Sequence, residues 1–151
     1  MNINIYSIEK ASHDEFSKIV DNYKKMLQKY AKVNEIIVFN KKISSAQNRS
    51  PKDARKAYSE ALYPYLKGYN IALHPDAKEF DSFEFSKIFD INRQLNLFIG
   101  GAYGFEDEFL QRCDKKVSLS QLTMSHKIAK IVLFEQVYRA LTILNKHAYH
   151  K

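Results

Sequence analysis

The sequence predicts an α/β fold, in which a mostly parallel sheet carries helices on both faces. Short apolar stretches alternate along the chain with longer stretches whose apolar residues recur every three or four positions. Residues 35–39 contain the run Ile-Ile-Val-Phe, which is too apolar to be solvated on both faces and is typical of a parallel sheet. The chain has 151 residues and no repeat, linker or low-complexity segment, so we expect one domain over residues 1–151.

Strands and helices are expected to alternate in a regular order. The expected strands are residues 2–8, 35–39, 69–73, 95–99 and 117–120. The expected helices begin at Ser12, Pro51, Ser82, Glu106 and His126. Ser12 opens a capping-box pattern, and Ser50 precedes Pro51, whose missing amide costs nothing at the first helical position. Pro64 is expected to kink or end the second helix.

The helix from His126 to about Lys146 is the longest of the late elements. Glu135 falls on its apolar stripe and should therefore pair with Arg139, four residues later. The stripe is expected to consist of Ile128, Ile131, Val132, Tyr138, Leu141, Thr142 and Leu144.

Composition narrows the classes of function. A single cysteine excludes a disulfide framework and a cysteine-based zinc site, and no apolar run is long enough to span a membrane. The start of the chain lacks the features of a secretory signal, so we expect a cytoplasmic protein without a membrane partner. The net charge of +7 lies mostly in residues 1–75 and favours a polyanionic partner, although a lysine-rich solvated surface explains it equally well.

Basic residues gather in and just after residues 40–51, which are expected to form a polar loop. These residues are Lys41, Lys42, Arg49, Lys52, Arg55 and Lys56. Such a loop at the rim of a sheet suits an RNA backbone. A solvated loop without a partner is an equally weighted alternative.

A glycine cluster follows the expected strand of residues 95–99. Three of the four glycines lie between Gly100 and Gly104, where they indicate a sharp turn or a close approach of the backbone. Ligands of open α/β sheets bind at such strand ends. The cluster has neither the dinucleotide-binding nor the P-loop spacing, and the acidic residues 106–108 that follow would repel a phosphate. We expect a neutral or cationic ligand here, or a tight turn with none.

The chain ends in His147-Ala148-Tyr149-His150-Lys151. Two histidines without a nearby carboxylate or cysteine are a weak metal signal, so no metal is expected. Chain ends are usually featureless, and this concentration of functional side chains suggests a tail that folds back into a site.

Four segments resemble the RlmH family of SPOUT-class methyltransferases. Residues 100–104 (GGAYG) are similar to the family's Gly-Gly-Pro-x-Gly turn, and residues 119–126 (LSQLTMSH) to its Leu-Ser-x-Met/Leu-Thr-x-Pro-His segment. Residues 134–140 (FEQVYRA) resemble its Glu-Gln-x-Tyr-Arg-Ala helix, and residues 146–151 (KHAYHK) its terminus. Alanine or serine replaces a proline in three of these segments, at Ala102, Ser125 and Ala148, and Lys130 stands where arginine is usual.

The resemblance implies an S-adenosylmethionine-dependent enzyme that methylates N3 of a pseudouridine in large-subunit (23S) ribosomal RNA, on the ribosome. It also implies a C-terminal trefoil knot and a homodimer. Two alternatives remain at this point: a SPOUT methyltransferase acting on transfer RNA, and a non-catalytic RNA-binding protein.

Matching residues carry the implied site. The cofactor pocket would consist of Leu73, Gly100, Gly101, Leu119, Ser120, Gln121, Leu122, Thr123 and Met124. The residues implied to act on the RNA are His126, Arg139, Tyr149, His150 and Lys151. His150 or His126 is expected to accept the N3 proton, because histidine titrates in a suitable range.

Overall fold

A computed structural model describes residues 1–151 and shows one five-stranded sheet. The strand order is β2-β1-β4-β3-β5, and every neighbouring pair is parallel. The strands are β1 (Asn2–Ile8), β2 (Lys32–Val38), β3 (Tyr69–Leu73), β4 (Leu95–Ile99) and β5 (Lys115–Val117). The expected α/β class is therefore confirmed, and the sheet is wholly parallel.

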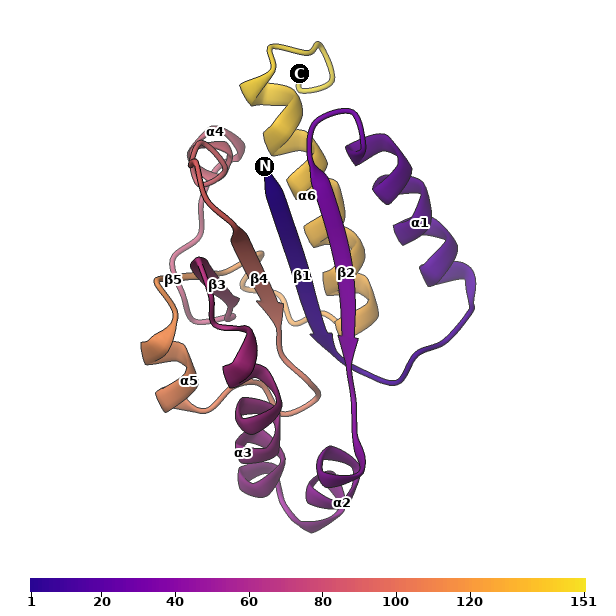
Figure 1. Ribbon diagram of the computed structural model, residues 1–151, viewed down its shortest axis with the longest axis vertical. Coiled ribbons are helices and arrows are strands. Elements are labelled where there is room, and N and C mark those ends of the chain that lie inside the picture. Colours follow the sequence, from indigo (N-terminus) through magenta and orange to yellow (C-terminus); the bar gives the residue numbers. More distant parts are fainter.

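Helices cover both faces of this sheet (Figure 1). They are α1 (Glu15–Leu27), α2 (Lys41–Arg49), α3 (Pro51–Leu62), the short 3-10 helix η1 (Tyr63–Tyr65), α4 (Ser82–Lys87), α5 (Asp107–Arg112) and α6 (His126–Leu144). Helices α1, α4 and α6 share one apolar core with the sheet, and α2, α3 and α5 share a second on the opposite face. None of the helices is long and apolar enough to cross a membrane.

Several expected boundaries were wrong. The capping box of α1 is formed by Asp14 and Ser17 rather than by Ser12, because Asp14 accepts from the Ser17 amide at 3.0 Å and the Ser17 hydroxyl accepts from the Asp14 amide at 2.9 Å. Strand β2 starts at Lys32 and β5 spans residues 115–117 rather than 117–120. The 3-10 turn at Pro64 confirms that this proline ends the regular helix.

The expected loop of residues 40–51 is mostly helix α2. Asn40 caps it by accepting from the Ile43 amide at 2.8 Å, and only Ile43 and Ala46 are buried. The remaining residues are polar or charged, so the helical period of apolar residues is too sparse to stand out in the sequence.

The buried stripe of α6 matches the expected one only in part: Tyr138, Leu141 and Thr142 are buried, whereas Ile131, Val132 and Leu144 are half-buried. Ile128 is 41% exposed, whereas the buried residues are Lys130, Leu133, Phe134, Val137, Tyr138, Ala140, Leu141 and Thr142. The helix is apolar on most of its circumference, since it packs against α1, α4 and the sheet, so periodicity alone did not identify the face. The expected pair is confirmed, because Arg139 Nη2 lies 2.6 Å from Glu135 Oε1.

A row of asparagines crosses the amino-terminal half of the sheet. Asn34, Asn4, Asn96 and Asn70 are register partners on β2, β1, β4 and β3. Their side-chain amides bond in sequence at 2.8, 3.0 and 2.9 Å. Asn4, Asn96 and Asn70 are buried, and pairing their amides ties four strands together in one register, because a slipped strand would leave them unpaired.

Candidate functional site

A cavity of about 430 Å³ lies at the carboxyl edge of the sheet, where β3 and β4 end. Its walls come from three segments: the end of β3 at Leu73–Pro75, the glycine turn after β4, and residues 119–126 between β5 and α6. A cavity therefore lies where the strand-end rule predicts a ligand site, and its volume suits a small organic ligand.

The glycine turn is shaped by contacts that exclude side chains. The Gly104 amide donates to the Gly101 carbonyl at 3.0 Å, and Gly104 has a φ of +74°. A Cβ on Gly101 would lie 2.6–2.8 Å from atoms of the Tyr58 side chain on α3. A Cβ on Gly100 would lie 3.3 Å from Phe105. At Gly101 the backbone therefore packs so closely against α3 that a side chain would require Tyr58 to move, and at Gly104 the positive φ favours glycine.

Residues 119–124 form an irregular wall with free backbone groups. None of them makes a backbone-to-backbone hydrogen bond. The segment is instead fixed by side chains: Ser118 Oγ donates to the Ser120 carbonyl at 3.0 Å, and Ser120 Oγ accepts from the Leu122 amide at 3.0 Å. The unpaired N–H and C=O groups can read the edge of a planar, polar ligand such as a nucleobase.

The cavity contains no lysine or arginine on its walls. The acidic residues at the start of α5 are also absent from the walls, contrary to the expectation that they face the ligand. Glu106 accepts a long hydrogen bond from Tyr63, and Glu108 pairs with Arg112 at 3.0 Å. The site still disfavours a phosphate, because it offers no counter-charge, and it accommodates a neutral or weakly cationic ligand.

Most of the residues expected to form the cofactor pocket meet at this cavity. Those on its walls are Leu73, Gly100, Gly101, Leu119, Ser120, Leu122, Thr123 and Met124, together with His126. Gln121 is not among the lining residues, although it belongs to the same segment. Sequence reasoning missed His74, Pro75, Ile99, Ala102, Gly104, Phe105, Ser125 and Ala129 as lining residues. The position of His74-Pro75 directly after a buried strand was the available signal.

The tail lies away from the cavity of its own chain. Tyr149 Oη donates to Glu135 Oε1 at 3.1 Å, and Arg139 Nη1 donates to His150 Nδ1 at 3.1 Å. Arg139 stands more than three turns beyond His126, about 20 Å along α6 at 1.5 Å per residue. The structure brings Arg139, Tyr149 and His150 together but does not bring them to His126, and Lys151 is exposed. The expected fold-back into the site is therefore not seen within one chain.

The tail cluster perturbs its own titrating groups. Burial, followed by the Glu135 carboxylate, raises the pKa of the Tyr149 phenol. The hydrogen bond to Glu135 raises the pKa of Arg139. Both groups consequently keep their protons at neutral pH, so Tyr149 and Arg139 act as hydrogen-bond donors rather than as bases.

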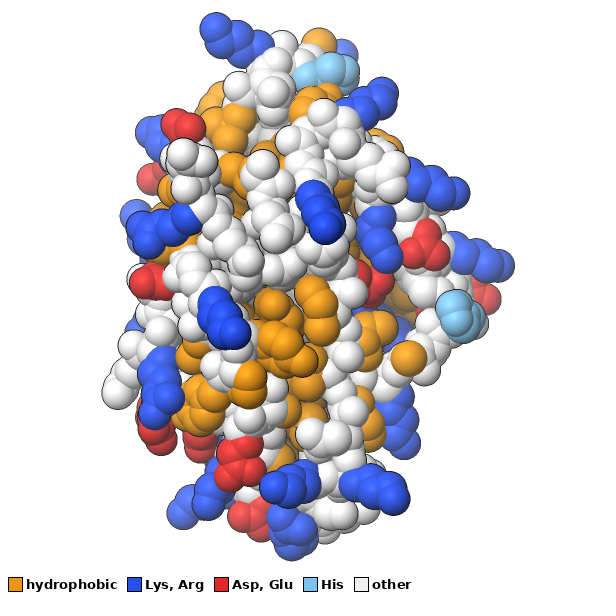
Figure 2. Space-filling model, viewed as in Figure 1, with side chains coloured by type: hydrophobic (Ala, Val, Ile, Leu, Met, Phe, Trp, Pro, Cys, Tyr) orange, Lys and Arg blue, Asp and Glu red, His pale blue; other side chains and the backbone are white.

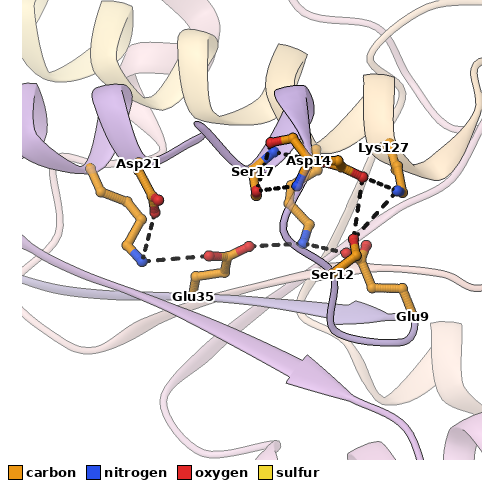
Figure 3. A network of polar contacts seen from close by, with 9 residues as sticks. Glu9, Ser12, Asp14, Ser17, Asp21, Glu35 and Lys127 are labelled. Carbon is orange, nitrogen blue, oxygen red and sulfur yellow. Dashed lines mark hydrogen bonds and ion pairs between the residues drawn. The ribbon is translucent and has the colours of Figure 1, made fainter. Parts of the chain in front are cut away.

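An ion network, buried at Lys130 and partly exposed at Lys127, fixes the first turns of α6 (Figure 3). Lys130 is 4% exposed and donates to Glu9 Oε1 at 2.9 Å and to Glu35 Oε2 at 2.8 Å. Lys127 pairs with Asp14 at the start of α1. These contacts join α6 to α1, β2 and the end of β1, and so hold His126 at the cavity wall.

Comparisons with known proteins agree with this geometry. A family profile described as "Predicted SPOUT methyltransferase" matches residues 1–150. The protein named ribosomal RNA large subunit methyltransferase H is 50% identical in Aliarcobacter butzleri and 49% identical in Campylobacter lari, with complete coverage of both chains in each case.

Solved structures share the fold at low sequence identity. A probable methylase family protein from Haemophilus influenzae has a TM-score of 0.57 and 13% identity, covering 99% of this chain and 70% of its own. A putative methyltransferase from Legionella pneumophila, solved with bound SAM, has a TM-score of 0.51 and 14% identity, covering 95% of this chain and 66% of its own. On the profile match and the full-length relatives, this chain belongs to the SPOUT methyltransferases and, within them, to the family of ribosomal RNA large subunit methyltransferase H.

Proposed function

We propose that this protein uses S-adenosylmethionine to methylate N3 of a pseudouridine in large-subunit (23S) ribosomal RNA. One observation carries the proposal: the glycine turn and residues 119–126, which resemble the family's motifs, line a single cavity. Relatives about half identical over the whole chain bear the name of an enzyme for this RNA.

The cofactor would lie between the glycine turn and residues 119–124. Free backbone groups of that segment would read the adenine, while Leu73 and Met124 supply apolar surface. The absence of basic side chains fits a cofactor that has no phosphate and carries a sulfonium cation. When bound, S-adenosylmethionine supplies a methyl group on an already activated carbon.

The protein's own residues must then position the nucleophile and remove its proton. N3 of pseudouridine is an imide nitrogen, which attacks only after its proton leaves. His126 is the histidine of the expected pair that lies on the cavity wall, at the first position of α6. We assign His126 as the residue of the same chain that accepts the N3 proton. Positioning of the nucleophile against the methyl group supplies much of the rate enhancement.

A homodimer would reconcile the distant tail with a role in this site. In one chain, Tyr149 and His150 are held on α6 far from the cavity. Every contact in a two-fold interface occurs twice. If the tail of one subunit reaches the cavity of its partner, the partner's tail therefore reaches the first subunit's cavity as well. Arg139, Tyr149, His150 and Lys151 would then hold the RNA and offset charge developing on the nucleophile.

The family also implies a C-terminal trefoil knot. Two contacts support it: the His74 amide donates to the Val117 carbonyl at 3.0 Å, and the Ser118 amide donates to the Lys78 carbonyl at 3.0 Å. The loop after β3 thus lies against the end of β5, where the chain turns toward α6. An experimental backbone trace, closed at its ends, should reduce to a trefoil; an unknotted trace would contradict this.

Methyl transfer from labelled S-adenosylmethionine tests the proposed function. Ribosomes are prepared with and without pseudouridine in the large subunit. Transfer RNA is assayed in parallel, at the same physiological ionic strength. We expect label only in the pseudouridine-containing subunit. Label in transfer RNA would favour the transfer-RNA enzyme, and no transfer despite cofactor binding would favour a non-catalytic RNA-binding protein.

A further inference from the structure

Helices α2 and α3 carry a dense group of cations on one end of the molecule. Figure 2 shows lysine and arginine side chains gathered at the lower end, where Figure 1 places these two helices. Between the helices lies an open hollow of about 510 Å³, called here the α2–α3 hollow. Its lining residues are Lys41, Lys42, Ser45, Arg49, Asp53, Lys56, Ala57 and Glu60.

Most of these cations have no partner within the chain. Arg49 pairs with Asp53 at 3.3 Å, and this is the only ion pair in the hollow. Lys41, Lys42 and Lys56 are exposed and contact no carboxylate. Only one lining residue, Ala57, is hydrophobic, so the hollow suits an anionic partner rather than an apolar one.

The two helices form a rigid platform rather than a flexible loop. Ser50 alone joins them: its amide donates to the Ala46 carbonyl at 3.2 Å, and its hydroxyl accepts from the Asp53 amide at 3.1 Å. Tyr58 is fully buried and donates from its hydroxyl to Gln47 at 2.6 Å, which binds α3 to α2. The backbone that carries these cations is therefore already ordered, so binding costs entropy mainly in the exposed side chains.

The platform is coupled directly to the cofactor cavity. The Tyr58 ring, on α3, is the surface against which Gly101 packs, and Gly101 lines that cavity. Helix α2 also follows the carboxyl end of β2. Strands β3 and β4 end at the cavity on the same edge of the sheet. An RNA that places a nucleotide in the cavity must therefore lie over this edge.

We propose that the α2–α3 hollow binds the phosphodiester backbone of the ribosomal RNA beside the target nucleotide. This inference rests on the proposed function and adds the surface that holds its substrate. Phosphate contacts position an RNA without reading its bases. The α2–α3 hollow suits such contacts, because it is lined by lysines and offers no apolar pocket for a base. Lys42 and Lys56, on opposite helices, each contact a phosphate.

The double variant Lys42→Gln/Lys56→Gln tests the proposal, with Lys29→Gln/Lys67→Gln as the matched control. All four lysines are exposed, and the control pair precedes β2 and β3 at the opposite edge of the sheet. Each phosphate contact contributes about 0.7–0.9 to the slope of log affinity against log salt. Losing two contacts at 0.15 M salt therefore weakens binding by about 15- to 30-fold and lowers the slope by about 1.5.

The measurements are filter binding to large subunits and to protein-free large-subunit RNA over a range of salt, with calorimetry of S-adenosylmethionine. The hollow variant should show the stated loss on both RNA-containing ligands and wild-type affinity for the cofactor, while the control binds like wild type. Unchanged affinity and salt slope in the hollow variant would overturn the proposal. A loss of affinity for subunits but not for protein-free RNA would also overturn it, since that result indicates that the hollow binds an acidic ribosomal protein. If wild-type protein methylates no ribosome, the proposed function fails separately, and the binding slopes still decide the role of the hollow.

Discussion

The tail of this protein lies about 20 Å along α6 from the cavity of its own chain, at 1.5 Å per helical residue. If the partner's tail completes each site, two inactive variants should restore activity when they share a dimer. One variant is Ala129→Trp, which fills the cavity from the second turn of α6 with an indole side chain. The other lacks residues 149–151.

The expected activity follows from counting sites. In a heterodimer of the two variants, the truncated chain supplies the intact cavity and the Ala129→Trp chain supplies the intact tail. The second site combines the filled cavity with the missing tail and is inactive. One site of two remains, so the heterodimer should have about half of the wild-type activity per dimer, as two-fold symmetry requires.

The heterodimer is obtained by co-expressing the chains with different tags and purifying on both. Methyl transfer to ribosomes is measured beside each homodimer, and cofactor affinity by calorimetry. Both homodimers should be inactive, with cofactor binding lost in Ala129→Trp and retained in the truncated protein. A doubly tagged heterodimer without activity would refute a tail that acts on the partner's cavity, and an active truncated homodimer would remove the tail from the mechanism.

Three further predictions concern the fold. Burial raises the pKa of the Cys113 thiol to about 12, so at pH 8 the folded chain should hold about a thousandfold less thiolate than the unfolded chain. Alkylation of Cys113, followed by mass spectrometry, should therefore be slow until denaturant is added. Equal alkylation rates with and without denaturant would contradict this. The hydrogen bond from Lys127 lowers the pKa of Asp14 to about 2, so the ionised carboxylate stabilises the fold fully above pH 4 and loses this effect as the pH falls through 2. The variant Asp14→Asn keeps a good helix cap but cannot ionise. In urea unfolding it should be less stable than wild type at pH 7 and equally stable below pH 2. Gly101→Ala drives a methyl into the Tyr58 ring and should cost about 1–3 kcal/mol in urea unfolding, whereas unchanged stability would mean that α3 yields at this point.

Strands β3 and β4 and the start of α3 were predictable because their signals are local. Residues 69–73 and 95–99 are short apolar runs, and the structure has them as strands with those bounds. Ser50 and Pro51 start α3 as expected, because a cap and a first-turn proline depend only on neighbouring residues.

Elements that depend on distant partners were missed. Helix α2 has only two buried residues, and its packing against α3 is not visible in a period of apolar residues. The asparagine row was also missed, since Asn4 and Asn96 read as polar strand positions until the register places them side by side. Lys130 lies in the core because Glu9 pairs with it from the end of β1 and Glu35 pairs with it from β2.

The cavity was predictable and the tail was not. The glycine turn follows β4 and residues 119–126 follow β5, and β3 lies between these strands. All three strands are parallel and end at the same edge of the sheet, so topology brings the two segments to one cavity. The tail follows a helix of 19 residues, and its placement depends on the length and direction of that helix rather than on any motif.

Nucleoside mass spectrometry of the treated ribosomal RNA tests the central claim most directly. Large subunits that contain pseudouridine are incubated with the protein and S-adenosylmethionine, and the RNA is digested to nucleosides. We predict a single new nucleoside, a pseudouridine with one added methyl on N3, that is absent when the pseudouridine is replaced by uridine. A methyl group on a ribose or on another base, or no new nucleoside despite bound cofactor, would contradict the assignment.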